Sequence, residues 1–319
     1  GSPGERALWN GPRPPLGRAK LGRTRETDLG SLLMLFPGQG SQKPGMAEHL
    51  WAHPVARETF SEAADVLGWD VGGLCRTGSM EELTRTDRTQ VAILTCSVAT
   101  WRLLDERGLT FSVAAGHSLG EYSALVAAGH MTFADALAVV DVRARAMHDC
   151  GLERQGAMAA VLGLDDDVVD DICAGIGEVW PANYNSPGQV VISGSPAAVR
   201  AAGDAAQAQG AKRVLPVPVS GAFHTPFMEG AAEHLADALA RVDFLPGRAG
   251  RAAFFSTTEV RYPAPQELAE LLARQLVSPV RFTQSIRAVL AEPEAPDHAL
   301  EVGPGNVLGG LMKRIDKHV

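Results

Sequence analysis

The pentapeptide Gly116-His117-Ser118-Leu119-Gly120 limits what this chain can fold into more than any other stretch. An apolar run, residues 111–115, precedes it, and a run rich in helix formers, residues 121–128, follows it. Gly-x-Ser-x-Gly between a strand and a helix is typical of a sharp turn that exposes the serine hydroxyl. The flanking glycines lack the Cβ atoms that would obstruct the turn. The helix would aim its N-terminal amides at an oxyanion formed there, so the pattern predicts that Ser118 is a nucleophile.

A nucleophilic serine needs a base, donors for the oxyanion and a group that selects the acyl chain. The alternative interpretation is a glycine-rich tight turn with an incidental serine. The strand-then-helix setting favours the nucleophile, because the motif requires that setting.

Composition and charge exclude several classes of function. A chain of 319 residues with 45% hydrophobic and 21% charged residues is typical of a soluble enzyme. The formal net charge of −8 argues against nucleic acid as the main partner, because phosphates require a basic surface. The four cysteines lack Cys-x-x-Cys spacing, which favours free thiols in a reducing compartment over disulfides or a metal site. No apolar run reaches the ~20 residues of a membrane helix, and the polar, proline-rich start lacks a signal-peptide pattern. We expect a cytoplasmic protein with no membrane contact and no metal.

The first ordered element is expected after a flexible N-terminal tail. Residues 1–29 are rich in Gly, Pro and Arg and lack periodicity. Residues 32–36 form a continuous apolar run, as in strands that are buried on both faces of a parallel sheet. The Gly38-Gln39-Gly40 turn would place Gln39 at the carboxyl edge of the sheet, where open α/β sheets bind ligands. A plain strand-to-loop connection explains this turn equally well.

Residues 132–150 predict a helix whose apolar stripe is shared or bordered by Arg143. Thr132 with Asp135 resembles a capping box. The stripe consists of Phe133, Leu137, Val140, Ala144 and Met147. A charge on the core side of a helix is costly unless it is paired. Arg143 is therefore either part of a structural salt bridge or a clamp for a substrate carboxylate, which a planar guanidinium suits.

Residues 155–219 form a separate pattern, which predicts a small ferredoxin-like subdomain. The elements follow the order β-α-β-β-α-β. Strands are expected over 157–162, 178–183, 189–193 and 213–217, and helices over 165–174 and 196–209. Such an insert would roof the larger sheet and leave a cleft, which is a usual place for a small-molecule site.

His224 lies where this insert rejoins the main body of the chain. A helix is expected over 226–242, with Pro226 in its first turn, where a missing amide does no harm. The chain has nine histidines, so any single one is more often incidental. Its position at this junction favours His224, whose neutral imidazole could take the Ser118 proton and return it to the leaving group.

The remaining segments alternate between strands and helices. Further helices are expected over 90–107, 266–276, 280–290 and 307–315, and further strands over 252–256 and 298–302. This alternation predicts an α/β fold with a mostly parallel sheet flanked by helices. We expect an α/β-hydrolase-like catalytic subdomain formed by residues 30–154 and 220–319, with the small subdomain inserted between the two parts.

Taken together, the motifs resemble the malonyl-CoA:acyl-carrier-protein transacylases of the fatty acid and polyketide synthase acyltransferase family. They run in the family's order from about residue 32 to 315, and the Gly-Pro-Gly-Asn string resembles the discrete enzymes. The matching strings are Phe36-Pro37-Gly38-Gln39-Gly40-Ser41-Gln42, Gly116-His117-Ser118-Leu119-Gly120-Glu121-Tyr122, Arg143 in its helix, Asn185-Ser186-Pro187-Gly188-Gln189, Gly221-Ala222-Phe223-His224, Gln275-Leu276-Val277-Ser278-Pro279-Val280 and Glu301-Val302-Gly303-Pro304-Gly305.

The resemblance implies a catalytic role for several matching positions. Ser118 would be the nucleophile and His224 its base. The backbone amides of Gln39 and Leu119 would form the oxyanion hole. Arg143 would clamp the free carboxylate of a malonyl group.

The resemblance also implies roles around this centre. The main-chain carbonyl of Gln275 would orient His224, in place of the carboxylate of a Ser–His–Asp triad. His117 and Asn185 would belong to the substrate-binding site. A Phe directly before the histidine, as Phe223 is here, goes with malonyl as the substrate in related polyketide enzymes. Its ring would crowd the C2 position of the acyl group.

The implied reaction moves malonyl from malonyl-CoA to the phosphopantetheine thiol of an acyl carrier protein, by a ping-pong mechanism, in a monomer without a cofactor. A substituted malonyl unit is an alternative substrate. An acyl hydrolase or thioesterase on the same scaffold is another alternative, against which Arg143 argues because such hydrolases handle acyl groups without a free carboxylate. A silent docking module is disfavoured by the pair of Ser118 and His224.

Overall fold

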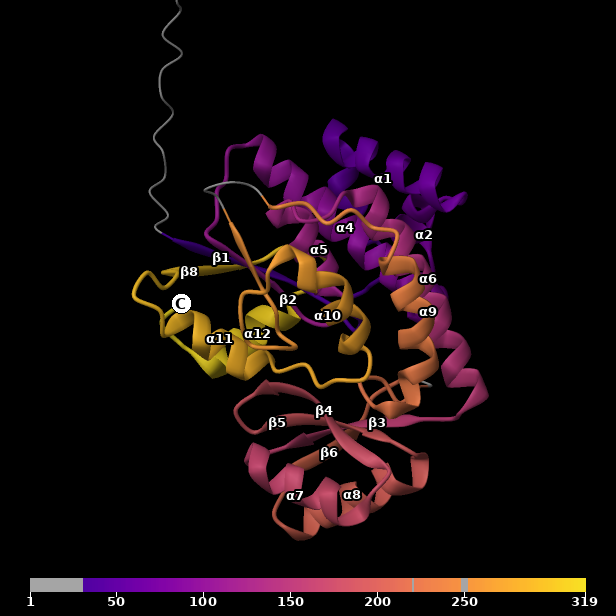
Figure 1. Ribbon diagram of the computed structural model, residues 1–319, viewed down its shortest axis with the longest axis vertical. Helices are drawn as coiled ribbons and strands as arrows, with labels where there is room; N and C mark the ends of the chain where they lie inside the picture. Colours follow the sequence, from indigo (N-terminus) through magenta and orange to yellow (C-terminus); the bar gives the residue numbers. More distant parts are fainter. Residues whose placement is uncertain (1–30, 220, 248–251) are drawn as a thin grey trace, which may run out of the picture.

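The computed structural model describes residues 31–219, 221–247 and 252–319 of the chain, and it contains two separate sheets (Figure 1). The predicted N-terminal tail, residues 1–29, lies outside the described residues. Within the described ranges, no helix is both long enough and apolar enough to cross a membrane.

The large sheet is parallel and has the strand order β7-β2-β1-β8. Its strands are β1 (Leu32–Phe36), β2 (Val113–Gly116), β7 (Ala253–Phe255) and β8 (His298–Glu301). In the register between the two central strands, Leu33 lies opposite Val113 and Phe36 opposite Gly116. The carboxyl ends of β1 and β2 therefore meet at one edge of the sheet, which places the turns after both strands side by side.

Helices cover both faces of this sheet, which is why its central strand is apolar throughout. Leu32, Met34 and Phe36 pack into the core shared with α4 (Thr86–Glu106), α5 (Gly120–Ala128) and α6 (Phe133–Glu153). Leu33 and Leu35 point to the opposite face, into a core with α11 (Phe282–Leu290) and α12 (Val307–Ile315). The other helical segments of the large subdomain are η1 (Glu48–Ala52), α1 (Pro54–Leu67), α2 (Val71–Thr77), α3 (Met80–Thr84), η2 (Pro226–Met228), α9 (Glu229–Leu239), η3 (Pro265–Glu267) and α10 (Leu268–Gln275).

The small sheet is antiparallel, with the order β4-β5-β3-β6, which is the strand order of a ferredoxin-like unit. One of its faces packs against two helices, and the other faces the large subdomain (Figure 1). Its elements are β3 (Ala157–Leu162), α7 (Asp166–Ile176), β4 (Val179–Ser186), β5 (Gln189–Gly194), α8 (Pro196–Ala208) and β6 (Arg213–Pro216). The α/β fold class and the small ferredoxin-like unit predicted from the sequence are confirmed.

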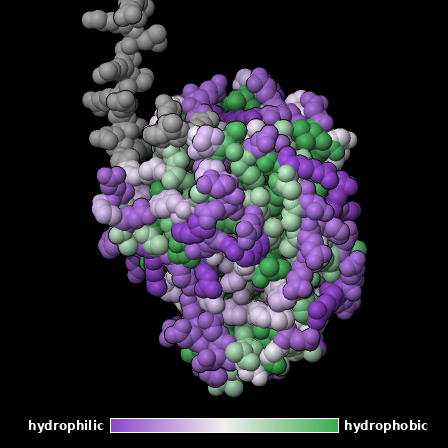
Figure 2. Space-filling model, viewed as in Figure 1, coloured by the Kyte–Doolittle hydropathy of each residue, from purple (hydrophilic) through white to green (hydrophobic). Residues whose placement is uncertain are grey.

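On the face shown in Figure 2 the outer surface of the molecule is mainly hydrophilic, whereas the apolar side chains of β1 lie inside. Hydrophilic side chains cover much of the face shown in Figure 2, and hydrophobic side chains form smaller areas among them. The large apolar residues of β1 are completely or almost completely buried. The apolar run from which β1 was predicted thus forms a buried strand between helices on both faces of the sheet.

A backbone bridge joins the two subdomains. The amide of Tyr184 in β4 donates to the carbonyl of Val280 (2.9 Å), and the amide of Val280 donates to the carbonyl of Ala182 (2.9 Å). Val280 itself is fully buried against the large sheet. The bridge fixes the edge of the small sheet at one side of the region between the subdomains, next to Asn183.

Three expected helices differ from the structure: α4 begins at Thr86 rather than at residue 90, the segment 266–276 starts as the 3-10 turn η3, and the segment 226–242 differs most. Residues 226–242 were predicted as a single helix, but the structure has a short 3-10 turn, Pro226–Met228, before α9, which ends at Leu239. The Thr225 side chain accepts a hydrogen bond from the amide of Phe227, and this cap tightens the first turn. His224 just before it has a φ of 61°, so the backbone changes direction at this residue.

The turn between β2 and α5 depends on two glycines. A Cβ atom on Gly116 would overlap the backbone of Gly120, and a Cβ on Gly120 would overlap the carbonyl oxygen of Phe36. Both neighbours are backbone atoms of the central sheet and its first helix, so they cannot move aside as the end of a flexible side chain can. The two glycines allow α5 to begin directly against β1.

We predict that Gly120→Ala lowers the free energy of unfolding by about 3 kcal/mol, because the added methyl group overpacks against backbone. Gly310→Ala is the matched control: position 310 lies inside α12 and nothing is within 4 Å of an added Cβ. That substitution should raise the free energy of unfolding by about 1 kcal/mol, because alanine favours the helix. Chemical denaturation measures both. Equal effects of the two substitutions would contradict the tight turn.

Candidate active site

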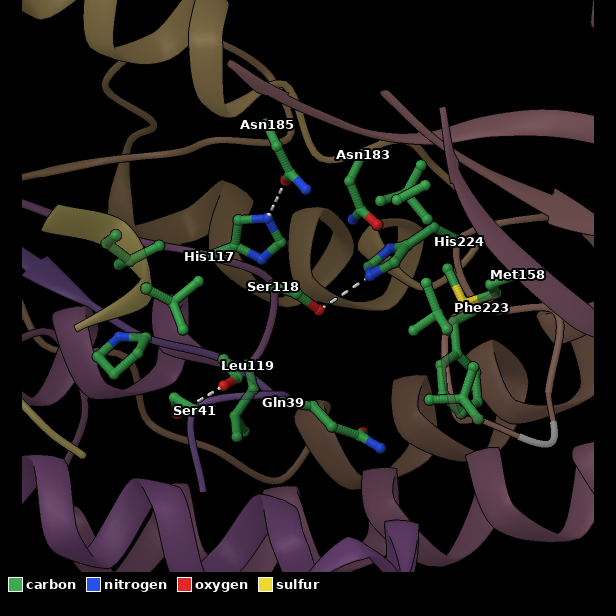
Figure 3. Close-up of a pocket in the computed structure, with 18 of the residues that line it drawn as sticks. Gln39, Ser41, His117, Ser118, Leu119, Met158, Asn183, Asn185, Phe223 and His224 are labelled. Atoms are coloured by element: carbon green, nitrogen blue, oxygen red, sulfur yellow. Dashed lines mark hydrogen bonds between the residues drawn. The ribbon is translucent and has the colours of Figure 1, made fainter. Parts of the chain in front are cut away.

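A cavity of about 280 Å³ lies between the two subdomains, where the sequence predicted a cleft. The large subdomain contributes Ser118, Arg143 and His224 to its lining, and the small sheet contributes Asn183 and Asn185. Figure 3 shows Asn183 and Asn185 on the same side of the cavity, with Ser118 between His117 and His224. Side chains from segments far apart in the sequence thus converge on Ser118.

Ser118 occupies a backbone conformation that few side chains adopt. Its φ is 52°, in the left-handed region, at the turn between β2 and α5. This is the strained turn that the Gly-x-Ser-x-Gly pattern predicted. The Ser118 Oγ lies 2.9 Å from Nε2 of His224, although the two residues are 106 positions apart in the chain.

The surroundings of His224 determine which ring nitrogen carries the proton. Its Nδ1 lies 3.0 Å from the carbonyl oxygen of Gln275 and 3.1 Å from that of Ser278. Carbonyl oxygens only accept hydrogen bonds, so Nδ1 must be the donor. The Nε2 of the neutral ring is then an acceptor, and it faces the hydroxyl of Ser118. The predicted carbonyl of Gln275 is in place, and the carbonyl of Ser278 is a second partner that sequence reasoning missed.

Electrostatics keep this ring neutral. Burial and the nearby positive charge of Arg143 lower the pKa of His224 to about 3. A neutral imidazole with its acceptor nitrogen on a hydroxyl can take a proton from that hydroxyl at neutral pH. The geometry therefore fits a serine activated by a histidine.

Arg143 is almost completely buried, with 1% of its surface exposed. Its Nη2 donates to Ser118 Oγ (3.0 Å) and to Gln275 Oε1 (3.0 Å), and its Nη1 donates to Gln90 Oε1 (2.5 Å). No carboxylate among the described residues forms an ion pair with it, which argues against the structural salt bridge. Arg145, two positions further on, is exposed and paired with Asp141.

The buried guanidinium retains donor capacity. Its Nε–H has no hydrogen-bond acceptor within the described part of the chain. Burial lowers the pKa of Arg143, but an arginine stays protonated in proteins. The site therefore holds a positive charge that is bound by neutral side chains beside the serine hydroxyl.

The two predicted oxyanion donors line the same cavity. Leu119 precedes the first residue of α5, and Gln39 lies in the turn after β1, which adjoins β2. In the described ranges neither backbone amide donates a hydrogen bond to another residue. Both amides are therefore available, and their role in binding an oxyanion stays a prediction.

His117 and Asn185 meet across the cleft. The Nε2 of His117 lies 2.8 Å from Oδ1 of Asn185, a contact drawn in Figure 3. Burial lowers the pKa of His117, which favours the neutral ring. The structure thus shows these two residues as a link between the subdomains that borders the cavity, and their role in substrate binding stays a prediction.

Phe223 lines the cavity next to His224, on the side where Figure 3 also shows Met158. Its ring lies directly against Gly221, where an added Cβ would overlap it. It is 7% exposed. An aromatic ring therefore borders the cavity that contains Ser118, and its crowding of the C2 position stays a prediction.

Sequence reasoning missed Gln90, Glu121 and Asn183. Gln90 is fully buried on α4, in a stretch, residues 89–99, in which every residue is buried. Glu121 is the single acidic residue in α5, all of whose residues are buried. A polar side chain on an otherwise buried helix face was the available signal for both. Asn183 lies in a predicted strand, and nothing in its spacing distinguished it.

Comparison with known proteins agrees with this geometry. Residues 33–314 match the family model described as acyl transferase domain. The chain is 44% identical over 287 residues to the malonyl CoA-acyl carrier protein transacylase of Salmonella typhimurium, covering 88% of this chain and 91% of that protein. It is 40% identical over 296 residues to the Bacillus subtilis protein of the same name, covering 91% and 92%.

Solved structures give the same result. A malonyl-transacylase in complex with a type II PKS acyl-carrier protein has a TM-score of 0.86 at 42% identity, covering 91% of this chain and 94% of that one. The malonyl CoA-acyl carrier protein transacylase from Coxiella burnetii has a TM-score of 0.85 at 37% identity, covering 90% and 92%. The chain therefore belongs to the acyl transferase domain family, among the malonyl CoA-acyl carrier protein transacylases.

Proposed function

We propose that this enzyme transfers a malonyl group from coenzyme A to the phosphopantetheine thiol of an acyl carrier protein, through an acyl-serine intermediate. The observation that carries the proposal is the position of Arg143, whose Nη2 lies 3.0 Å from the Ser118 Oγ that faces His224. A nucleophile, a base and a carboxylate receptor therefore meet at one point.

In the first half-reaction Ser118 Oγ attacks the thioester carbonyl while Nε2 of His224 takes its proton. The free amides of Gln39 and Leu119 would receive the resulting oxyanion. The C–S bond then breaks, and the proton on His224 passes to the sulfur of coenzyme A. Each preorganised oxyanion donor typically contributes about 3 kcal/mol to lowering such a barrier.

The second half-reaction reverses these roles. The phosphopantetheine thiol gives its proton to His224, and the sulfur attacks the carbonyl of malonyl-Ser118. When the C–O bond breaks, the proton returns to Ser118 Oγ. Because both half-reactions use the same atoms, a single serine and a single histidine are sufficient for the ping-pong cycle.

Arg143 and Phe223 select malonyl over other acyl groups. The guanidinium has a buried Nε–H without an acceptor in the described residues, and a carboxylate on the acyl group would supply one. The ring of Phe223 borders the cavity and would crowd a branch at C2, so we assign unsubstituted malonyl as the substrate. Arg143 also argues against the hydrolase alternative, because a hydrolase for acyl groups without a free carboxylate has no use for a buried guanidinium beside the serine.

The enzyme is proposed to act in the cytoplasm. The four cysteines are free thiols, which suits the cytoplasm. The enzyme is proposed to act as a monomer and without a cofactor, with malonyl-CoA and the carrier protein as its two substrates. Polyketide and fatty acid biosynthesis both use this reaction.

Incubation with malonyl-CoA should add one malonyl group to the protein, and Ser118→Ala should abolish the adduct, because the attacking oxygen is gone. Intact-mass spectrometry measures the adduct. Ser123→Ala is the matched control: it removes a buried hydroxyl from α5, the helix that follows Ser118, and the malonyl adduct should still form. A malonyl adduct that persists in Ser118→Ala would overturn the assignment.

Arg143→Ala should lower kcat/KM for malonyl-CoA by about 150-fold, since truncating a buried charged partner costs about 3 kcal/mol. Acetyl-CoA has no free carboxylate, so its loading should fall much less. Arg145→Ala, on the exposed side of the same helix, is the control and should leave both substrates unaffected. Steady-state loading with each substrate gives the ratio. Equal losses of kcat/KM for malonyl-CoA and acetyl-CoA would show that the role of Arg143 is structural.

The lowered pKa of His224 predicts how stability depends on pH. In the unfolded state the side chain of His224 binds a proton with a pKa of 6.5, whereas in the folded state its pKa is about 3. The unfolded state therefore binds more protons as the pH falls below 6.5, and the folded state loses stability. At pH 5.5 this single group should lower the free energy of unfolding by about 1.4 kcal/mol relative to pH 8. His224→Gln should remove that part of the pH dependence, as urea denaturation at both pH values would measure. An unchanged slope in His224→Gln would contradict the neutral histidine.

A further inference from the structure

A buried carboxylate lies directly behind the reacting centre. Glu121 is fully buried in the first turn of α5, three residues after Ser118. Its Oε1 accepts from the amide of Thr257 (2.5 Å) and from Ser256 Oγ (3.1 Å), and its Oε2 accepts from Nε2 of Gln275 (2.5 Å). The mechanism above makes no use of this group.

The donors around Glu121 are those of an ionised carboxylate. A backbone amide and a side-chain NH₂ can only donate. Ser256 Oγ already accepts from the amides of Thr258 and Glu259 (both 3.2 Å), so its own hydrogen is directed to Glu121. Burial raises the pKa of Glu121, and these hydrogen bonds offset part of that rise. Both carboxyl oxygens accept from fixed donors, which favour the ionised form, and Thr257 Oγ1 also lies 3.1 Å from Oε1.

The side chain of Gln275 connects this charge to the active site. Its Nε2 donates to Oε2 of Glu121 and to the carbonyl oxygen of Ser118 (3.1 Å), which uses both of its hydrogens. Its Oε1 is therefore turned toward Arg143 and accepts from Nη2 (3.0 Å). A reversed amide would place NH₂ against a guanidinium that can only donate. Glu121 and the carbonyl of Ser118 together determine which end of the Gln275 amide faces Arg143.

We propose that Glu121 is a positioning residue for malonyl selection, which orients Arg143 through the amide of Gln275 and balances its charge from a distance. A carboxylate in direct contact with the guanidinium would take the donors that a malonyl carboxylate needs. With one amide between the two charges, neutral acceptors hold the cation through three of its five N–H groups, and Nε–H and one hydrogen of Nη1 have no acceptor among the described residues. This assignment rests on the proposed malonyl transfer.

Glu121→Gln tests the assignment, because it removes the charge with little change of volume. If the new side chain keeps an oxygen toward the amide of Thr257, its NH₂ faces that of Gln275, so the Gln275 amide must reverse or lose a hydrogen bond. The ratio of kcat/KM for malonyl-CoA to that for acetyl-CoA should fall about tenfold, the typical effect of a lost hydrogen bond to a charged group. Glu62→Gln, which neutralises a carboxylate paired with Arg102 outside the cavity, should leave the ratio unchanged.

A purely structural role would give a different result. It would lower malonyl and acetyl loading by equal factors, together with the melting temperature, and this outcome would overturn the proposal. A failure of the unmodified protein to load malonyl at all would instead contradict the proposed function. The two kinds of failure are therefore distinguishable in one set of assays.

Gln275→Met provides a second, independent variant. It removes the side-chain amide but keeps the main-chain carbonyl that faces His224. The malonyl-to-acetyl ratio should fall again, and adding Glu121→Gln in this background should cause no further fall, since the connection is already broken. Full additivity of the two substitutions would show that Glu121 does not act through Gln275. If Glu121→Gln does not fold, an unchanged ratio in Gln275→Met overturns the proposal by itself.

Discussion

A guanidinium buried beside a serine hydroxyl is the constraint on which the rest of this site depends. Arg143 must keep its charge to bind a carboxylate, yet it is almost entirely removed from water. A direct ion pair would satisfy the charge but occupy the donors. The structure instead surrounds the guanidinium with neutral acceptors, the side-chain oxygens of Gln90 and Gln275, and leaves Nε without a partner in the described residues. The compensating negative charge, on Glu121, lies one amide further away.

The same constraint accounts for the unusual support of the histidine. A carboxylate hydrogen-bonded to Nδ1 of His224, as in a Ser–His–Asp triad, would introduce a full negative charge close to Arg143 and compete with substrate for it. Two main-chain carbonyls, from Gln275 and Ser278, fix the same tautomer without that charge. The positive neighbour and burial both disfavour protonation of the ring, which keeps the base neutral. The carboxylate receptor and the base are therefore compatible because each is held by uncharged groups.

Much of this could be predicted from sequence because the signals are local. The Gly-x-Ser-x-Gly turn, the inward face that carries Arg143 and the β-α-β-β-α-β order each depend on spacing within one or two elements. The contacts of Gln275 with Ser118 and of Glu121 with Thr257 join residues more than a hundred positions apart, so no spacing within one element encodes them. The helix expected over 226–242 was wrong in its first turn and its end, because periodicity does not report how the cap at Thr225 tightens the backbone. Which residues contact one another over such distances in the chain is decided by tertiary packing.

The two chain crossings between the subdomains carry the reacting groups. α6, which bears Arg143, leads directly into β3 of the small sheet, and the return from β6 leads to Phe223 and His224. The bridge between Tyr184 and Val280 fixes the small sheet on a third side, two residues after the carbonyl that holds His224. The spacing between the guanidinium, the imidazole and Ser118 is set within the large subdomain, through Gln90, Gln275 and Ser278. The insert supplies the opposite wall of the cavity, with Asn183 and Asn185, so its seating decides how much room an acyl group has beside groups that are already in place.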